Sequence, residues 1–356
     1  MKKAIKAICI VLAALVLIAA CYVAYIFLAF HRIGDQTLTV GGAAAAGAAE
    51  IGKEYRIVSY NIGFGAYESD YGFFMDGGTQ SWAWSKERLD ANLKNIAAFL
   101  REQDADFTIV QEVDTDSTRS YHFDERTWLI PALEEDAAWI FAQNYDSPFL
   151  FYPITQPHGA SKAGLMTFSD YSVTAAERVE LPIESGFTKF LDLDRCYSKS
   201  RIPAGEGELV LYNLHLSAYT SDGAIANEQL KMLLDDMEKE YAAGNYCIAG
   251  GDFNKDLLGD SSVYFGKADK EYTWAQPIPS GLLDGYHASL VAPLDEQNPV
   301  PSCRNADGPY HPGQFVLTID GFLISDNVGL VSSEVIDTGF AWSDHNPVAM
   351  RFTLKG

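Results

Sequence analysis

The sequence predicts an α/β fold in which strand-rich sheets are flanked by helices and are preceded by one N-terminal transmembrane helix. Three observations support this prediction: an uncharged apolar run near the start of the 356-residue chain, seven strand-like apolar runs after it, and two amphipathic helical patterns among those runs. Because many of the strands follow one another without a helix between them, a simple doubly wound parallel sheet is not expected.

The first element is the apolar run from Ile8 to Phe30, which contains 23 residues and no charged side chain. As a helix that rises about 1.5 Å per residue it would span roughly 35 Å, enough to cross a bilayer. Three lysines lie within the first six residues, and this excess of positive charge predicts a cytoplasmic N-terminus. We therefore expect residues 1–32 to be a single-pass anchor in the cell membrane, with the rest of the chain extracytoplasmic.

A lipoprotein anchor is the alternative for the same segment. Residues 18–21 (IAAC) resemble a lipoprotein cleavage site in which Cys21 would accept the lipid, although the apolar run continues nine residues past it. A cleaved signal peptide would have an apolar core of roughly 7–15 residues, which is shorter than this run. Both the transmembrane helix and the lipoprotein place the bulk of the chain outside the cytoplasm.

One catalytic domain, residues 54–356, is expected after the anchor. Residues 33–53 include the low-complexity stretch GGAAAAGAAEIG and are expected to form a linker. Apolar residues at helical spacing predict helices over residues 85–103 and 224–243. The strand-like runs cover residues 55–60, 107–110, 164–168, 208–214, 246–251, 317–324 and 347–354.

The net charge of −22 bears on the substrate. Nucleic-acid-binding domains usually carry a basic surface, so broad affinity for DNA backbones is not expected of this chain. A bound divalent cation can invert the local field, so phosphate-ester substrates remain compatible with the acidic composition.

The five cysteines do not indicate a disulfide scaffold. Cys9 and Cys21 lie in the apolar run, and the other three allow at most one intramolecular pair. A bridge between Cys196 and Cys303 stays open, whereas Cys247 falls in an apolar strand and is expected to be a buried core residue.

Polar residues stand at the ends of six apolar strands. A lone Asn or Asp in such a place is usually a turn residue, and a lone His is more often structural than catalytic. Six such segments in one chain are harder to explain in that way, because unpaired polar groups beside buried strands are costly. The segments are NIGF (61–64), QEVD (111–114), NLHL (213–216), GGDFN (250–254), TIDGF (318–322) and SDHNP (343–347).

In this order the six segments resemble those of the endonuclease/exonuclease/phosphatase superfamily, which includes deoxyribonucleases, abasic-site endonucleases, sphingomyelinases and inositol polyphosphate phosphatases. The resemblance runs from about residue 55 to residue 352, and its sharpest motifs are GDxN and SDH. It implies a four-layer α/β sandwich of two packed, mostly antiparallel sheets flanked by helices. It also implies a metal-dependent hydrolase that activates a water for in-line attack on phosphorus.

The resemblance assigns three residues to a metal site. Glu112 would be the principal ligand, Asn61 would lie beside it, and Asp344 would hold the metal directly or through water. Mg²⁺ prefers oxygen ligands of this kind, and Mn²⁺ is a possible substitute.

Five further residues receive catalytic roles from the same resemblance. Asp252 would orient or deprotonate the attacking water, and Asn254 would hydrogen-bond the phosphate or the metal shell. His345 would bind a phosphate oxygen while Asp320 fixes its tautomer. His215 is a candidate acid for the leaving group.

Four residues are weaker candidates for phosphate contacts. Arg119 and Tyr121 follow the QEVD segment closely, Lys162 precedes an apolar strand, and Arg304 lies in SCRN (302–305). For each of them an ordinary surface position is an equally good interpretation. The aromatic-rich residues 71–84 are expected to form a substrate loop, a membrane-interface contact or part of the core.

These residues predict an extracytoplasmic phosphoesterase that acts on a nucleic acid or a phospholipid. The family supports the first substrate class, and the membrane anchor supports the second; a small phosphorylated metabolite stays open. The alternative is a catalytically silent surface binding protein with the same fold. The membrane is the expected partner through the N-terminal helix, and no protein partner is predicted.

Overall fold

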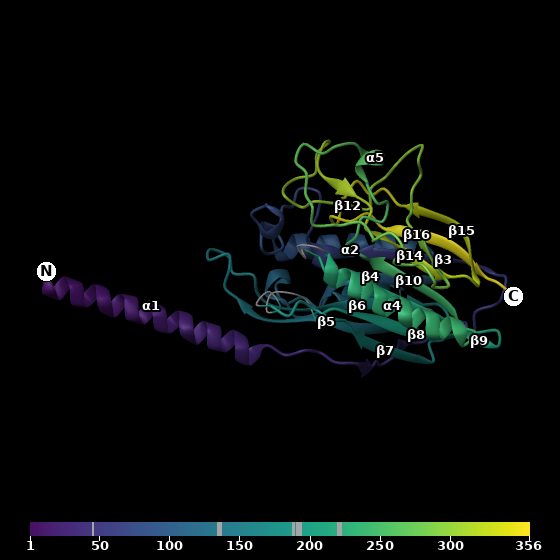
Figure 1. The fold of residues 1–356 in the computed structure, drawn as a ribbon, viewed down its shortest axis with the longest axis horizontal. Coiled ribbons are helices and arrows are strands. Elements are labelled where there is room, and N and C mark those ends of the chain that lie inside the picture. Colours follow the sequence, from purple (N-terminus) through teal and green to yellow (C-terminus); the bar gives the residue numbers. More distant parts are fainter. Residues whose placement is uncertain (45, 134–136, 187–188, 190–193, 219–222) are drawn as a thin grey trace.

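Two seven-stranded β-sheets pack face to face and are flanked by helices in the computed structural model, which describes every residue except 45, 134–136, 187–188, 190–193 and 219–222 (Figure 1). The first sheet contains, in spatial order, β1 (Gln36–Thr37), β7 (Ala175–Glu180), β8 (Cys196–Ala204), β9 (Gly207–His215), β10 (Tyr246–Asp252), β14 (Asp320–Ser325) and β11 (Ala288–Val291). The second contains β15 (Val328–Val335), β16 (Val348–Leu354), β3 (Glu54–Asn61), β4 (Phe107–Asp114), β6 (Gly159–Ser169), β5 (Ala138–Leu150) and β2 (Gly41–Gly42). A separate small sheet pairs β12 (Cys303–Arg304) with β13 (Val316–Leu317).

Apolar side chains divide the molecule into four layers. One buried cluster lies between the sheets and joins Ile57 of β3 to Ile248 of β10. A second cluster packs the helices α2 (Lys86–Glu102) and α3 (Arg126–Leu133) on the second sheet, and a third packs α4 (Ala224–Ala242) on the first sheet. This arrangement confirms the predicted α/β sandwich of two sheets flanked by helices. Apart from the N-terminal helix, the other helices of the described residues are single turns: η1 (Gly63–Gly65), η2 (Phe74–Asp76), η3 (Thr118–Ser120) and α5 (Ser262–Phe265).

The sequence explains locally why the helix α2 begins where it does and which of its faces is buried. The Ser85 hydroxyl caps α2 by accepting a hydrogen bond from the Arg88 backbone N–H at 3.2 Å. Leu89, Leu93 and Ile96 then recur at helical spacing and are buried. Both α2 and α4 lie within a residue or so of the predicted ranges.

Each sheet has one parallel pair among its described strands, and all other pairings are antiparallel. β3 pairs with β4 in parallel and β9 pairs with β10 in parallel. Parallel neighbours need a crossover connection, and α2 and α4 supply it in the two cases. The carboxyl ends of these four strands therefore point to one edge of the sandwich.

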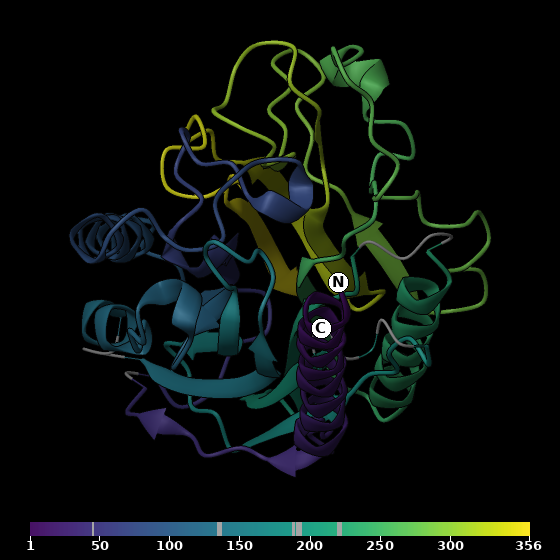
Figure 2. The same ribbon diagram turned by 90° about the vertical axis from the view of Figure 1, so that its left-hand side faces the viewer.

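The N-terminal helix α1 (Lys2–Ala29) projects away from the sandwich (Figure 1), as the view along it also shows (Figure 2). It is long and apolar enough to cross a membrane, and only Ile26 among its residues is buried.

The segment expected to be a linker, residues 33–53, contributes strands to both sheets of the sandwich. Its β1 pairs with β7 in the first sheet, and its β2 pairs with β5 in the second. Single bridges follow, from Ala46 to Tyr171 and from Ala49 to Ala204. Its small side chains do not prevent this pairing, because strand pairing uses backbone N–H and C=O groups that every residue here carries.

Two further details differ from the pattern in the sequence. The run at 317–324 is divided, because Asp320 and the residues after it pair with β10 while Leu317 pairs with β12. Cys196, Cys247 and Cys303 are buried free thiols, so the open question of a bridge between the first and last is answered in the negative.

Candidate active site

Strand register brings the predicted site residues together at one edge of the sandwich. Asp252 at the end of β10 is level with His215 on one neighbouring strand and with Asp320 on the other. Asn61 ends β3 beside Gln111 of β4. Because all these strands are buried, their polar ends are held by the same packing that forms the core.

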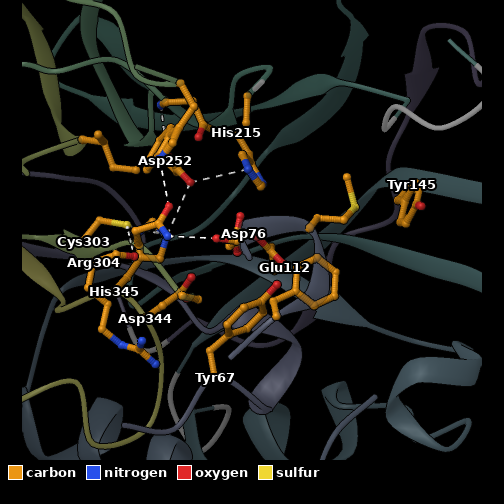
Figure 3. Close-up of a pocket in the computed structure, with 18 of the residues that line it drawn as sticks. Tyr67, Asp76, Glu112, Tyr145, His215, Asp252, Cys303, Arg304, Asp344 and His345 are labelled. Atoms are coloured by element: carbon orange, nitrogen blue, oxygen red, sulfur yellow. Dashed lines mark hydrogen bonds and ion pairs between the residues drawn. The ribbon is translucent and has the colours of Figure 1, made fainter. Parts of the chain in front are cut away.

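A cavity of about 490 Å³ opens at this edge (Figure 3). Eight of the predicted residues line it: Glu112, Arg119, His215, Asp252, Asn254, Arg304, Asp344 and His345. Asn61 and Asp320 lie behind that lining and hold lining residues by hydrogen bonds.

Asn61 links the two acidic groups of the cavity. Its Nδ2 donates to Glu112 Oε1 at 3.2 Å and to Asp252 Oδ2 at 3.0 Å. Its Oδ1, the atom through which an amide would bind a cation, accepts the Gly63 N–H at 3.0 Å. In this arrangement Asn61 lies beside Glu112 and orients the two carboxylates. A direct role as a metal ligand has less support, because its Oδ1 is already hydrogen-bonded to the Gly63 N–H.

A local irregularity of β4 turns Glu112 into the cavity. The pairing of β4 with β6 shifts between Val110 and Val113, so that one extra residue lies on β4. Glu112 has a φ of 57°, in the left-handed region that residues with a side chain rarely occupy. Gln111 points instead between the sheets, where its Nε2 donates to Asn213 Oδ1 at 2.8 Å.

Asp252 is almost completely buried. Its Oδ1 accepts the Asn254 backbone N–H at 2.8 Å, and its Oδ2 lies 3.4 Å from His215 Nε2 and 3.8 Å from His345 Nε2 (Figure 3). Burial raises the pKa of Asp252 to about 7, although the His345 charge opposes the increase. A carboxyl group with a pKa near neutrality can exchange a proton at physiological pH.

Asn254 is the second site residue with a left-handed backbone. Its φ is 49°, and its Nδ2 donates to the Leu216 carbonyl at 2.8 Å. The strained turn is therefore held from both sides, by that carbonyl and by the Asp252 carboxylate.

His345 is paired with a carboxylate on the side away from the cavity. Its Nδ1 lies 2.8 Å from Asp320 Oδ2, which also accepts the Ser302 hydroxyl at 2.7 Å. Burial alone would lower the pKa of His345, but the charge of Asp320, the contact with Cys303 and the hydrogen bonds to both together hold that pKa well above the ordinary value. His345 is thus a cation that can face a phosphate oxygen.

His215 is in the opposite state. Burial lowers its pKa well below the ordinary value, and the charges of Arg195 and His345 lower it further. Two histidines on either side of Asp252 are therefore held in different protonation states, one neutral and one cationic.

Glu112 and Asp344 are the acids best placed to hold a divalent cation. Burial raises the pKa of Asp344 to about 6, and the Glu112 carboxylate contributes to the increase. Two carboxylates that repel each other at the mouth of a cavity are a donor set that Mg²⁺ would stabilise. Asp252, Asp320 and His345 also bring ligand atoms within 4.8 Å of one another. The hydrogen bond that already joins Asp320 to His345 makes that trio a less suitable cation site.

The four weaker candidates fall into two pairs. Arg119 and Arg304 line the cavity, but Arg119 is bound by both oxygens of Asp114, at 2.9 and 3.1 Å. Arg304 donates to the backbone carbonyls of residues 68, 71 and 308. Tyr121 donates to the Ala83 carbonyl and Lys162 is exposed, and neither lines the cavity. The structure therefore gives no support for phosphate contacts by Tyr121 and Lys162, because neither residue lines the cavity.

Several residues of the site carried no signal that a sequence pattern could find. Ser302 supports Asp320, Cys303 Sγ lies 3.7 Å from His345 Nε2, and Arg195 donates to the His215 carbonyl at 3.3 Å. His158 also lines the cavity, and burial lowers its pKa to about 3. All four come from segments whose position depends on tertiary packing. The aromatic stretch at 71–84 divides between the core and the cavity wall, where it contributes Phe73, Met75 and Asp76.

Comparison with known proteins identifies the chain's relatives. The sequence model of the Endonuclease/Exonuclease/phosphatase family matches residues 58–345. No curated protein is significantly similar in sequence.

Solved structures share the fold at low identity. An endonuclease/exonuclease/phosphatase from Beutenbergia cavernae DSM 12333 superposes with a TM-score of 0.57 at 18% identity, covering 85% of this chain and 72% of that one. ANGEL2, a 2',3'-cyclic phosphatase, gives 0.55 at 16% identity, covering 90% and 99%. D. rerio TDP2 in complex with a single strand DNA product gives 0.52 at 13%, covering 85% and 99%.

Proposed function

Because the chain belongs to the endonuclease/exonuclease/phosphatase family, whose members are hydrolytic phosphoesterases, we propose that this cavity hydrolyses a phosphate ester with the help of a divalent cation. The observation that carries the proposal is the position of Asp252 between Asn61, His215 and His345. Phosphoryl hydrolysis requires a base or orienting group for water, a charge for the phosphoryl oxygens and an acid for the leaving oxygen. The cavity supplies one group for each need.

Each group has a role that follows from its protonation state. Asp252 accepts the proton of the attacking water, since its pKa of about 7 keeps a large fraction of it as carboxylate at neutral pH. His345 is cationic and stabilises charge that develops on a phosphoryl oxygen. His215 and Asn254 complete the cavity around the ester as a leaving-group contact and a hydrogen-bond donor.

The cation site of the proposal consists of Glu112 and Asp344, with Asn61 orienting Glu112. A bound Mg²⁺ or Mn²⁺ would polarise the phosphoryl oxygen and neutralise its charge. The cation would in turn favour the ionised form of Asp344, because its charge offsets the burial and the repulsion from Glu112 that raise the pKa of Asp344.

We place the catalytic domain outside the cytoplasm, on the membrane surface to which α1 anchors it. The support is the charge asymmetry around α1, whose three lysines precede the apolar run. The lipoprotein anchor at Cys21 is less compatible with a continuous helix that extends to Ala29.

The test is hydrolysis of bis-p-nitrophenyl phosphate by the full chain in detergent, with Mg²⁺, with Mn²⁺ and with EDTA. We expect turnover that needs the cation and that falls by roughly 10²-fold or more in Asp252→Ala and in His345→Ala. Val331→Ala on β15, an exposed position remote from the cavity, is the matched control. Turnover that survives both active-site substitutions would contradict the proposed roles.

A silent binding protein is the competing outcome of the same experiment. Absence of turnover on this ester and on DNA, RNA and phospholipid, together with cation binding that Glu112→Gln does not weaken, would favour it. Cation binding can be measured by calorimetry and does not depend on activity.

A further inference from the structure

The tip of the β5–β6 hairpin carries an exposed apolar surface with no formal charge. Phe149, Phe151, Tyr152 and Ile154 are 42%, 50%, 62% and 78% exposed. Residues 147–161 contain no Asp, Glu, Lys or Arg, although the whole chain is 21% charged. Single exposed apolar residues are common, but four within six residues at a projecting tip indicate a contact surface.

This tip is attached to the membrane helix. The Tyr22 hydroxyl donates to the Phe149 carbonyl at 3.0 Å, and the Phe149 N–H donates to the Tyr25 hydroxyl at 3.0 Å. The Tyr22 ring packs edge-on against Phe151, with ring centroids 4.8 Å apart. The hairpin and α1 thus leave the same side of the sandwich together (Figure 1).

The length of α1 sets the depth at which this contact lies. From Lys6 to Tyr25 the helix rises roughly 28 Å, close to the thickness of the hydrocarbon core. With Lys6 at one boundary, Tyr22 and Tyr25 fall at the other, where tyrosine side chains are enriched. The hairpin residues that contact these tyrosines therefore lie at the level of the lipid headgroups.

The same hairpin forms part of the wall of the cavity. Tyr145 before the tip and His158 after it both line the cavity, and Tyr152 packs against Phe74 of η2 with ring centroids 5.8 Å apart. The strand register explains this closeness. At the end of β4, Asp114 pairs with Ala163 of β6, so the hairpin tip lies at the same end of the second sheet as the cavity. A bilayer that receives the tip thus also meets the rim of the cavity.

We propose that the apolar hairpin tip inserts into the outer headgroup region of the bilayer and turns the cavity toward it, so that the substrate is a phosphodiester of a lipid headgroup. The membrane contact stands on the exposed residues and on their attachment to α1. The substrate class rests in addition on the proposed function. The net charge of −22 agrees with this choice over a nucleic acid, because a chain of that charge repels a DNA backbone at long range.

Fluorescence of the full chain in phosphatidylcholine vesicles tests the membrane contact without reference to activity. A tryptophan is introduced at the tip by Ile154→Trp, or at an exposed apolar position of β15 by Val331→Trp as a matched control, and the signal of the native chain is subtracted. Lipids brominated at shallow acyl positions should quench the Ile154→Trp signal at least twofold and leave Val331→Trp unchanged. Equal quenching of the two variants would overturn the proposal.

Hydrolysis tests the substrate class. The double variant F151S/I154S should lower turnover of vesicle phosphatidylcholine or sphingomyelin at least tenfold and leave turnover of bis-p-nitrophenyl phosphate unchanged, whereas the control L330S/V331S should change neither rate. Turnover of single-stranded DNA with none of phospholipid would overturn the lipid substrate. If the native chain hydrolyses none of these substrates, the proposed function is overturned. The quenching result would still decide whether the hairpin tip contacts the membrane.

Discussion

Asp252 is the residue on which the contacts of the cavity converge. It receives hydrogen bonds from Asn61 and from the Asn254 backbone, and it faces two histidines in different protonation states. Burial of this acid raises its pKa into the range that suits proton transfer, and it also lowers the stability of the fold when the acid is ionised.

The substitution Asp252→Asn should therefore abolish turnover and yet stabilise the fold at alkaline pH. The raised pKa of about 7 means that the folded protein retains a proton that the unfolded chain loses near pH 4. Stability consequently falls as pH rises between these two values, and a neutral amide is free of that loss. In EDTA, the melting temperature of the variant should exceed that of the native chain by a few degrees at pH 8, about 2–4 °C per kcal/mol.

At pH 5 the same comparison should show a smaller difference, since Asp252 is then largely protonated in the native fold. Differential scanning calorimetry at the two pH values measures both differences. A variant that is destabilised equally at pH 5 and pH 8 would show that the enclosure of Asp252 does not raise its pKa.

At the scale of the elements, the two parallel strand pairs separate catalysis from stability. Their carboxyl ends carry Asn61, Glu112, His215 and Asp252, whereas ion pairs lie near the opposite ends of β3 and β9. The clearest example is at the end of α4, where Glu240 Oε1 lies 2.5 Å from both Lys199 and Arg201 of β8.

Glu240→Gln should destabilise the fold without affecting turnover per folded molecule. Burial alone would raise the pKa of Glu240, but hydrogen bonds from Arg201, Lys199 and Asn245 lower it to about 2. Its contribution is therefore complete above pH 4.5 and is lost as pH falls toward 2. At pH 7 we expect a loss of roughly 2 kcal/mol in the free energy of unfolding, because the buried Lys199 and the partly exposed Arg201 lose a shared carboxylate and keep only Asp236 and Glu208 as partners.

The matched control is Lys94→Gln, which removes an exposed pair with Asp90 and should change stability by about 0.5 kcal/mol or less. Urea unfolding at pH 7 and pH 3 compares the two variants. A loss in Glu240→Gln that is as large at pH 3 as at pH 7 would contradict the ionic origin of the effect.

At the scale of the whole molecule, the segment that follows α1 contributes strands to both sheets. Arg178 of β7 is fully buried and donates to the carbonyls of Ile33 and Gly34, just after α1, and Arg32 pairs with Asp194 at 2.8 Å. The sandwich is thus held close to the end of α1.

A chain that starts at Gly52 should consequently be less stable than one that starts at His31. The shorter chain lacks β1 and β2 and leaves the Arg178 guanidinium with fewer carbonyl partners, and each unsatisfied buried donor costs about 1–3 kcal/mol. The midpoint of urea unfolding of the two purified chains checks this. Equal midpoints would mean that residues 31–51 behave as the linker that their composition indicates.

The sequence by itself determined the family, the two crossover helices and the eight motif residues around the cavity. These features are local: apolar periodicity specifies a strand or a helix, and a polar residue at the end of a buried strand needs a partner. The sequence could not predict that Glu112 points into the cavity, because this direction depends on a bulge that forms only when β4 pairs with β6.

The tertiary structure alone decided the remaining features, since they arise from contacts between distant segments. The carbonyls that hold Arg304, the free state of Cys196 and Cys303, and the pairing of residues 36–49 with both sheets are examples. The protonation states of His215 and His345 also belong here, because they depend on burial and on Asp320 rather than on residue type. Residue type and spacing named the groups of the site, and packing set their direction and their charge.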